Sequence, residues 1–157
     1  MKALLLTVGA THKKWIAEGE KEYIDRLKHY VDFEDITVPD IRNTSNLSAE
    51  QQKMKEGELL ISRLQTGDFV ILLDERGKQF GSREFSANMQ SIMNRGLKRV
   101  VFIIGGPYGF SESVYAIANQ KMSLSSLTFP HDLVRVIFLE QLYRAFTILR
   151  GEKYHHD

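Results

Sequence analysis

The feature that most constrains the fold is the regular alternation of short apolar runs with longer segments of helical periodicity. The apolar runs lie at residues 1–8, 33–38, 69–73 and 100–104. The segments that follow the first three runs, near residues 15–30, 49–64 and 82–95, carry apolar residues at helical spacing. Strands that alternate with helices in this way form parallel sheets. The pattern predicts an α/β fold with a mostly parallel sheet and helices on both faces.

The rest of the chain continues this pattern without a break. A short helix is expected near residues 113–120, a short strand at 122–125 and a last helix at about 133–150. No repeat, linker or low-complexity segment interrupts the sequence. With 157 residues, 43% of them hydrophobic, the chain is large enough to bury a core by itself. We therefore expect residues 1–157 to form a single domain.

The sequence also predicts where some of these elements begin and end. Ser48 and Gln51 have the spacing of a helix capping box, and Ser82 is expected to cap the helix near residues 82–95. Residues 74–78, directly after the third apolar run, are expected to form a loop at the end of that strand.

Apolar residues surround nearly the whole axis of the last helix, which is unusual for a surface helix. A helix that is apolar on all sides is buried on all sides, and one sheet face covers only part of it. A partner subunit would cover the remainder, because an exposed patch of that size favours aggregation. The sequence thus predicts a homodimer through this helix. The apolar positions are Leu133, Val134, Val136, Ile137, Phe138, Leu139, Leu142, Tyr143, Ala145, Phe146, Ile148 and Leu149.

Two irregular loops follow strands in the second half of the chain. The first, at residues 105–110, has three glycines in five positions, and the second follows the strand at 122–125. Glycines let the backbone approach a ligand closely, although a tight turn alone would also explain them. Because open α/β sheets bind ligands at the carboxyl ends of their strands, we expect the two loops to form one crevice.

Several function classes are disfavoured by composition and motif. The loop after the first strand, Val8-Gly9-Ala10-Thr11, has one glycine where a dinucleotide-binding fold has three, which argues against an NAD enzyme. The chain has no cysteine, and its histidines form no pattern with metal-ligand spacing, so no metal site is predicted. A net charge of +1 gives no general attraction to nucleic acid, so RNA binding would need a local patch. The absence of cysteine and of a signal peptide or membrane span fits a cytoplasmic protein.

The carboxyl-terminal tail and two arginines have both structural and functional interpretations. The tail directly follows the predicted dimer helix, so it is either a frayed end or a segment that reaches the partner's crevice. There Tyr154 could stack on a base and His155 could titrate near neutrality. Arg135 lies within an apolar run, so it either pairs across the dimer or faces an anionic ligand. Glu140 and Arg144 have the spacing of an ion pair within a helix.

These segments together resemble the bacterial ribosomal RNA large subunit methyltransferase H family, a SPOUT methyltransferase family. The resemblance covers the full length of the chain, and its carboxyl-terminal motifs are specific to the family. The matching residues are Ile104-Gly105-Gly106-Pro107 with Gly109, residues 124–131, Leu133-Val134-Arg135-Val136, residues 140–145 and Tyr154-His155.

The resemblance implies a fold, an activity and partners. The fold would contain a deep trefoil knot in the carboxyl-terminal half, an exception to the rule that chains do not thread loops. The protein would be an obligate homodimer that transfers the methyl group of S-adenosylmethionine to N3 of a pseudouridine. The substrate would be helix 69 of 23S rRNA within the assembled 70S ribosome.

The resemblance also implies a set of site residues. His155 would act as base or orienting group, Tyr154 would support it, and Arg135 or Arg144 would contact RNA. Two other readings are a ribosome-binding factor of the same fold that holds the cofactor weakly or not at all, and a dehydrogenase, which the first loop disfavours. The cofactor-binding residues would be Leu73, Gly105, Leu124, Ser125, Ser126, Leu127, Thr128 and Phe129.

Overall fold

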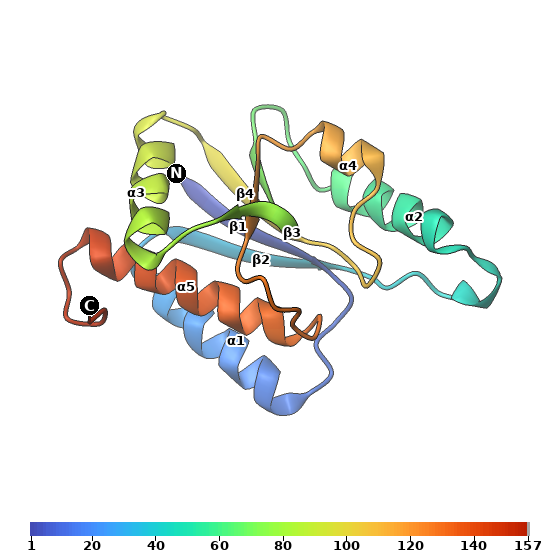
Figure 1. Ribbon diagram of the computed structural model, residues 1–157, viewed down its shortest axis with the longest axis horizontal. Coiled ribbons are helices and arrows are strands. Elements are labelled where there is room, and N and C mark those ends of the chain that lie inside the picture. Colours follow the sequence, from blue (N-terminus) through green and yellow to red (C-terminus); the bar gives the residue numbers. More distant parts are fainter. Residues whose placement is uncertain (157) are drawn as a thin grey trace.

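A five-stranded parallel sheet organises the molecule in the computed structural model, which describes residues 1–156 (Figure 1). The strand order is β2-β1-β4-β3-β5, and every pairing is parallel. The predicted fold class is therefore confirmed, whereas the trefoil knot stays a prediction. The strands are β1 (Lys2–Val8), β2 (Asp32–Val38), β3 (Phe69–Gln79), β4 (Arg99–Ile104) and β5 (Gln120–Ser123).

Helices cover both faces of the sheet, as the buried strands require. α1 (Lys14–Leu27), α3 (Ser82–Asn94) and α5 (Leu133–Leu149) lie on one face, while α2 (Ala49–Ile61) and α4 (Glu112–Ala116) lie on the other (Figure 1). Alternate residues of β1 separate the two cores, because successive side chains of a strand point to opposite faces. Leu5 packs in the core that contains Phe138 of α5, and Leu4 packs in the core that contains Leu60 of α2.

The observed ends of the helices agree only in part with those predicted from the sequence. Ser48 caps α2 as expected, since its hydroxyl accepts from the Gln51 backbone N–H and the Gln51 side chain accepts from the Ser48 N–H. The expectation that Ser82 caps the next helix is wrong, because Ser82 is already the first helical residue of α3 and Gly81 occupies the cap position. α4 is shorter than predicted because the chain enters β5 at Gln120.

The longest strand, β3, bends where the sequence predicted only a loop. Leu73 and Lys78 both pair with Met122 of β5, so residues 74–77 form an excursion between two pairings with the same residue. Gly77 makes this possible: a Cβ atom added there would lie 2.4 Å from the backbone nitrogen of Met122 and 2.6 Å from its Cα. Only glycine permits such an approach of two backbones.

Gly77→Ala is expected to lower the free energy of unfolding by about 1 to 3 kcal/mol, because the new methyl group overlaps main-chain atoms that cannot rotate away. Urea denaturation followed by circular dichroism measures the change. Gly81→Ala is the matched control, since nothing lies within 4 Å of a Cβ atom at that position. Equal stabilities of the two variants would contradict the close approach of Gly77 to β5.

Within one chain, α5 is covered more fully than its sequence suggested. α1 and α3 flank it and the sheet lies beneath it, so none of its residues is exposed and several, Val136 and Ile137 among them, are half-buried. The apolar composition of α5 is thus explained largely inside the chain, and the homodimer stays a prediction. In the described part of the chain, no helix has both the length and the apolar character that a membrane crossing requires.

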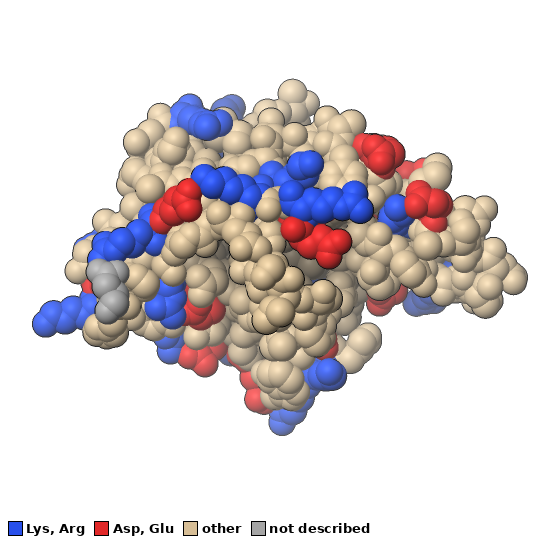
Figure 2. Space-filling model, in the orientation of Figure 1, with Lys and Arg blue, Asp and Glu red and all other residues tan. Residues whose placement is uncertain are grey.

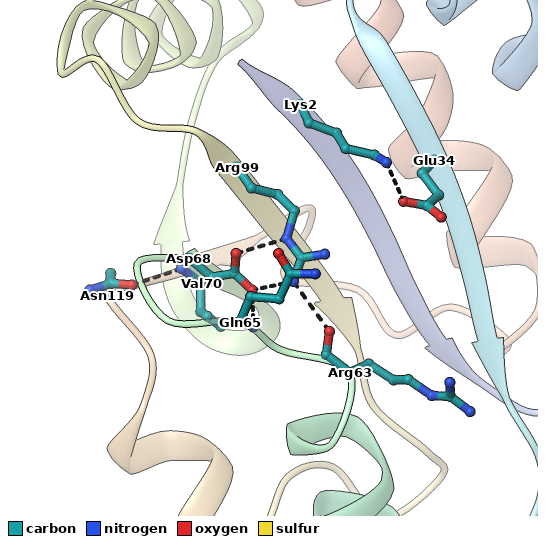
Figure 3. Close-up of polar contacts among 8 residues, drawn as sticks. All are labelled: Lys2, Glu34, Arg63, Gln65, Asp68, Val70, Arg99 and Asn119. Atoms are coloured by element: carbon teal, nitrogen blue, oxygen red, sulfur yellow. Dashed lines mark hydrogen bonds and ion pairs between the residues drawn. The ribbon is translucent and has the colours of Figure 1, made fainter.

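A buried ion pair joins the start of β4 to the loop before β3 (Figure 3). Arg99 Nε lies 2.7 Å from Asp68 Oδ1, and Arg99 Nη2 lies 2.5 Å from Asp68 Oδ2 and also donates to the Arg63 carbonyl. Only 10% of the Arg99 side chain and 5% of the Asp68 side chain are exposed. By contrast, the pair of Lys2 and Glu34 in the same view is more than a third exposed.

Candidate functional site

A cavity of about 880 Å³ lies at the carboxyl ends of three adjacent strands. Residues of β3 from Leu73 onward and the loops that follow β4 and β5 line it, and Val134 of α5 lines it as well. Sequence reasoning predicted one crevice from the two loops, and the structure brings them together with β3 between them. All eight residues predicted to bind a cofactor line this cavity: Leu73, Gly105, Leu124, Ser125, Ser126, Leu127, Thr128 and Phe129.

The glycine loop after β4 forms a tight turn in one wall of the cavity. The Gly109 N–H donates to the Gly106 carbonyl at 3.1 Å, which closes a turn with Pro107 and Tyr108 at its corners. Gly109 has φ +81, a conformation that favours glycine. At Gly105, a Cβ atom would lie 2.9 Å from the Phe110 ring and 3.2 Å from the Gly109 carbonyl. The glycines are therefore required by packing and by turn geometry.

A buried carboxylate supports this turn from beneath. Glu56 of α2 is 2% exposed, and a Cβ atom on Gly106 would lie 2.2 Å from its Oε2. Its Oε1 accepts from Gln52 at 2.9 Å, whereas Oε2 has no hydrogen-bond partner among residues 1–156. Burial raises the pKa of the Glu56 carboxyl. The carboxyl group thus fills the space that any side chain at Gly106 would need.

Serine hydroxyls shape the opposite wall, which is formed by the loop after β5. Ser123 Oγ donates to the Ser125 carbonyl at 2.9 Å, and Ser125 Oγ accepts from the Leu127 N–H at 2.9 Å. Leu124 and Phe129 are half-buried, so they supply apolar wall, but Leu127 is 74% exposed. The expected apolar contact of Leu127 with a ligand therefore lies at the cavity mouth.

A polar rim completes the cavity and was not predicted from the sequence. Tyr115 donates its hydroxyl to Asp74 Oδ2, and burial together with this carboxylate raises the pKa of Tyr115 to about 12. Arg76 lies on the exposed part of β3 next to them. Figure 2 shows basic side chains across the middle of the face, over this half of β3, with acidic groups at their edges. Asp74 directly follows the apolar run at residues 69–73, a position that could have identified it.

Arg135 lies beneath the loop after β1 and does not face solvent. It is 3% exposed, and its guanidinium donates to the Val8 carbonyl at 2.6 Å and to Thr11 Oγ1 at 3.2 Å. Burial lowers its pKa, although a guanidinium remains charged at neutral pH. No carboxylate among residues 1–156 lies within 4 Å of it. Arg135 Nη2 also lies 3.1 Å from Nε2 of His131, a cavity residue that sequence reasoning did not assign to the site.

The carboxyl-terminal tail folds back onto α5 of its own chain. The Tyr154 hydroxyl donates to Glu140 Oε1 at 3.0 Å, and its ring meets Tyr143 edge-on at 4.8 Å. Burial raises the pKa of Tyr154, so its hydroxyl stays protonated at neutral pH. His155 Nδ1 lies 3.4 Å from Nη1 of Arg144, which also pairs with Glu140. Neither tail residue lines the cavity of the same chain, and nor does Arg135.

Comparison with known proteins assigns the chain to a family. The family model described as "Predicted SPOUT methyltransferase" matches residues 1–155. The chain belongs to the SPOUT methyltransferase family. It is 56% identical over 156 residues to ribosomal RNA large subunit methyltransferase H of Christiangramia forsetii, which covers 99% of both chains. It is 52% identical over the full length of both chains to the protein of the same name from Parabacteroides distasonis.

Among solved structures, a probable methylase family protein from Haemophilus influenzae Rd KW20 shares the fold, with a TM-score of 0.55 and 12% sequence identity. That similarity covers 99% of this chain and 70% of the other. At this identity the likeness supports the fold alone. It agrees with the assignment of the chain to the SPOUT methyltransferases.

Membership of the SPOUT family implies S-adenosylmethionine as methyl donor, and the cavity fits such a ligand. Its volume lies in the range of small-molecule sites. Leu73, Leu124 and Phe129 offer apolar wall for a flat adenine ring, and loop N–H and C=O groups can bind its polar edge. Gly105 and Gly106 both line the cavity, so their backbone groups are among those that can contact a ligand there. Among residues 1–156, no three His, Asp or Glu side chains are placed to hold a metal.

Proposed function

We propose that this SPOUT methyltransferase transfers the methyl group of S-adenosylmethionine to N3 of a pseudouridine in helix 69 of 23S rRNA within the 70S ribosome. The observation that carries the proposal is the cavity that gathers all eight expected cofactor residues at one sheet edge. Full-length relatives at 52–56% identity that are named for ribosomal RNA methylation support the substrate class. We also infer that residues 1–157 act as one cytoplasmic domain.

The residues of the cavity would bind and orient the cofactor. S-adenosylmethionine, when bound, supplies an electrophilic methyl group on a sulfonium. The apolar walls and the backbone of the glycine turn would hold it so that the methyl group faces the mouth, because methyl transfer depends chiefly on in-line orientation. Leu73, Gly105 and residues 124–129 would make these contacts.

The nucleophile requires more of the protein, because N3 of pseudouridine carries a proton at neutral pH. We infer that a homodimer brings the tail of one subunit to the cavity of the other, since the tail does not reach its own cavity. The Arg144 guanidinium only donates hydrogen bonds, so a neutral His155 accepts at Nδ1 and carries its proton on Nε2. His155 would then donate to a base carbonyl and stabilise the N3 anion, while the N3 proton would pass to water. Tyr154 would position it.

Methyl transfer from labelled S-adenosylmethionine to ribosomes tests the function directly. Ribosomes from a strain that lacks the modification should accept one methyl group in 23S rRNA, at N3 of a helix 69 pseudouridine. A net charge of +1 predicts weak binding to isolated RNA, so a short naked hairpin should react poorly. Absence of cofactor binding in calorimetry would instead indicate a ribosome-binding factor, and efficient methylation of the hairpin would contradict the ribosome requirement.

His155→Ala is expected to lower kcat about tenfold without changing cofactor affinity, because one orienting hydrogen bond is lost while the cavity stays intact. His155→Gln should retain much of the activity, since its amide also donates. Single-turnover methylation of ribosomes measures the rate. A loss of 100-fold or more in both variants would assign His155 as general base instead, and full activity of His155→Ala would exclude any role.

A further inference from the structure

An exposed aromatic ring stands at the mouth of the cavity. Tyr108 is 55% exposed although it lines the same cavity as the glycine turn. Among residues 1–156, no aromatic ring, cation or hydrogen-bonding group pairs with its side chain. Its neighbours Phe110 and Tyr115 differ, because their rings meet edge-on at 5.8 Å. The Tyr108 ring is therefore available to a ligand.

The backbone that carries this ring is held in a fixed turn. Tyr108 follows Pro107, whose ring fixes its own φ, and precedes Gly109, whose N–H closes the turn on the Gly106 carbonyl. Glu56 supports the turn at Gly106. An aromatic side chain on a rigid turn loses little conformational entropy when it binds a flat partner. Such a position suits stacking.

The methyl acceptor must approach the cavity through this mouth. If the cofactor occupies the cavity, the reacting nitrogen must come within about 3 to 3.5 Å of the methyl carbon. A base whose Watson–Crick edge is presented in this way has left its stack, and its faces need new partners. We propose that Tyr108 stacks on the nucleobase that accepts the methyl group and so positions it, an inference that rests on the proposed function.

Leu127 on the opposite wall offers a second apolar surface for the same base. It is 74% exposed, lines the same cavity, and its N–H is already bound to Ser125 Oγ. Its backbone is thus fixed while its side chain is free. The base lies between an aromatic face and an aliphatic one, with the exposed Arg76 on the rim near the RNA backbone.

Steady-state kinetics with unmodified 70S ribosomes tests the stacking role of Tyr108. Tyr108→Ala is expected to raise the KM for ribosomes about tenfold, which is within the range found for loss of one base stack. The affinity for S-adenosylmethionine, measured by calorimetry without ribosomes, should change less than twofold. Tyr108→Phe should have the same KM for ribosomes as the protein without a substitution, because stacking needs the ring and not the hydroxyl. Met54→Ala, which removes a 58% exposed side chain on α2, is the control for loss of exposed apolar surface.

The outcomes separate this inference from the proposed function. An unchanged KM in Tyr108→Ala, with methyl transfer intact, would overturn the stacking role alone. A rise in the cofactor dissociation constant equal to the rise in KM would also overturn it, since Tyr108 would then cover the cofactor. A Tyr108→Phe variant as impaired as Tyr108→Ala would assign the role to the hydroxyl. If the protein without any substitution transferred no methyl group to ribosomes, the proposed function would be wrong.

Discussion

Gly106→Ala is expected to lower kcat/KM for ribosome methylation about 100-fold. The new Cβ would lie 2.2 Å from Oε2 of the buried Glu56, so either the carboxylate or the glycine turn must move. Because Gln52 and the surrounding core hold Glu56, we expect the turn to move toward the cavity. A displacement of about 1 Å in a group that orients reactants can cost a factor of 100. Calorimetry should show weaker cofactor binding in the same variant.

A double-mutant cycle tests whether the contact with Glu56 is the cause. Glu56→Ala removes the overlapping carboxylate. Alone it should cost less than about tenfold, because Oε2 has no hydrogen-bond partner among residues 1–156 and Oε1 loses the bond from Gln52. The combination of Gly106→Ala with Glu56→Ala should recover most of the activity, a strong departure from additivity. If the double variant were as impaired as the product of the single effects, the steric explanation would be wrong.

Asp68→Ala is expected to lower the free energy of unfolding by about 3 to 5 kcal/mol, because it leaves the Arg99 guanidinium buried without a counter-charge. Asp68 also accepts from the Gln65 N–H at 2.8 Å, so the turn before β3 loses a hydrogen bond as well. Urea denaturation at constant ionic strength measures the loss.

Two comparisons make the Asp68 result specific. Glu34→Ala, which breaks the exposed pair with Lys2, should cost less than about 1 kcal/mol (Figure 3). Asp68→Ala combined with Arg99→Met should be more stable than Asp68→Ala alone, because the unpaired charge is removed with its partner. Similar losses in Asp68→Ala and Glu34→Ala would show that burial of the pair contributes nothing.

The architecture of the sheet could be predicted because its strands are continuous apolar runs. β4 is buried along its whole length, as expected for a strand in the middle of a parallel sheet that is covered on both faces. The crevice was predictable for a related reason: irregular loops at the ends of parallel strands meet at one edge, and the cavity includes both loops. Local chemistry likewise predicted the cap at Ser48.

Other features depend on contacts between residues far apart in sequence and could not be predicted. The apolar surface of α5 suggested an outside partner because no pattern showed that α1 and α3 would flank it. Glu56 has an ordinary helical position, and only the fold places its carboxyl group beneath Gly106. Arg135 was expected to meet RNA or a dimer partner, whereas the fold directs it to the Val8 carbonyl.

The pairing of β1 with β4 has a consequence for the order in which the chain can fold. β1 is synthesised first and finds β2 nearby, but its other neighbour begins at Arg99, which pairs with Lys2. Closing so long a loop costs entropy before the strand contacts compensate for it, and folding slows accordingly. During synthesis β1 therefore keeps an unpaired edge until most of the protein has left the ribosome. Until β4 has been synthesised, this free edge of β1 must be kept from pairing with other chains. The need arises on the ribosome, the same particle that the finished enzyme is proposed to modify.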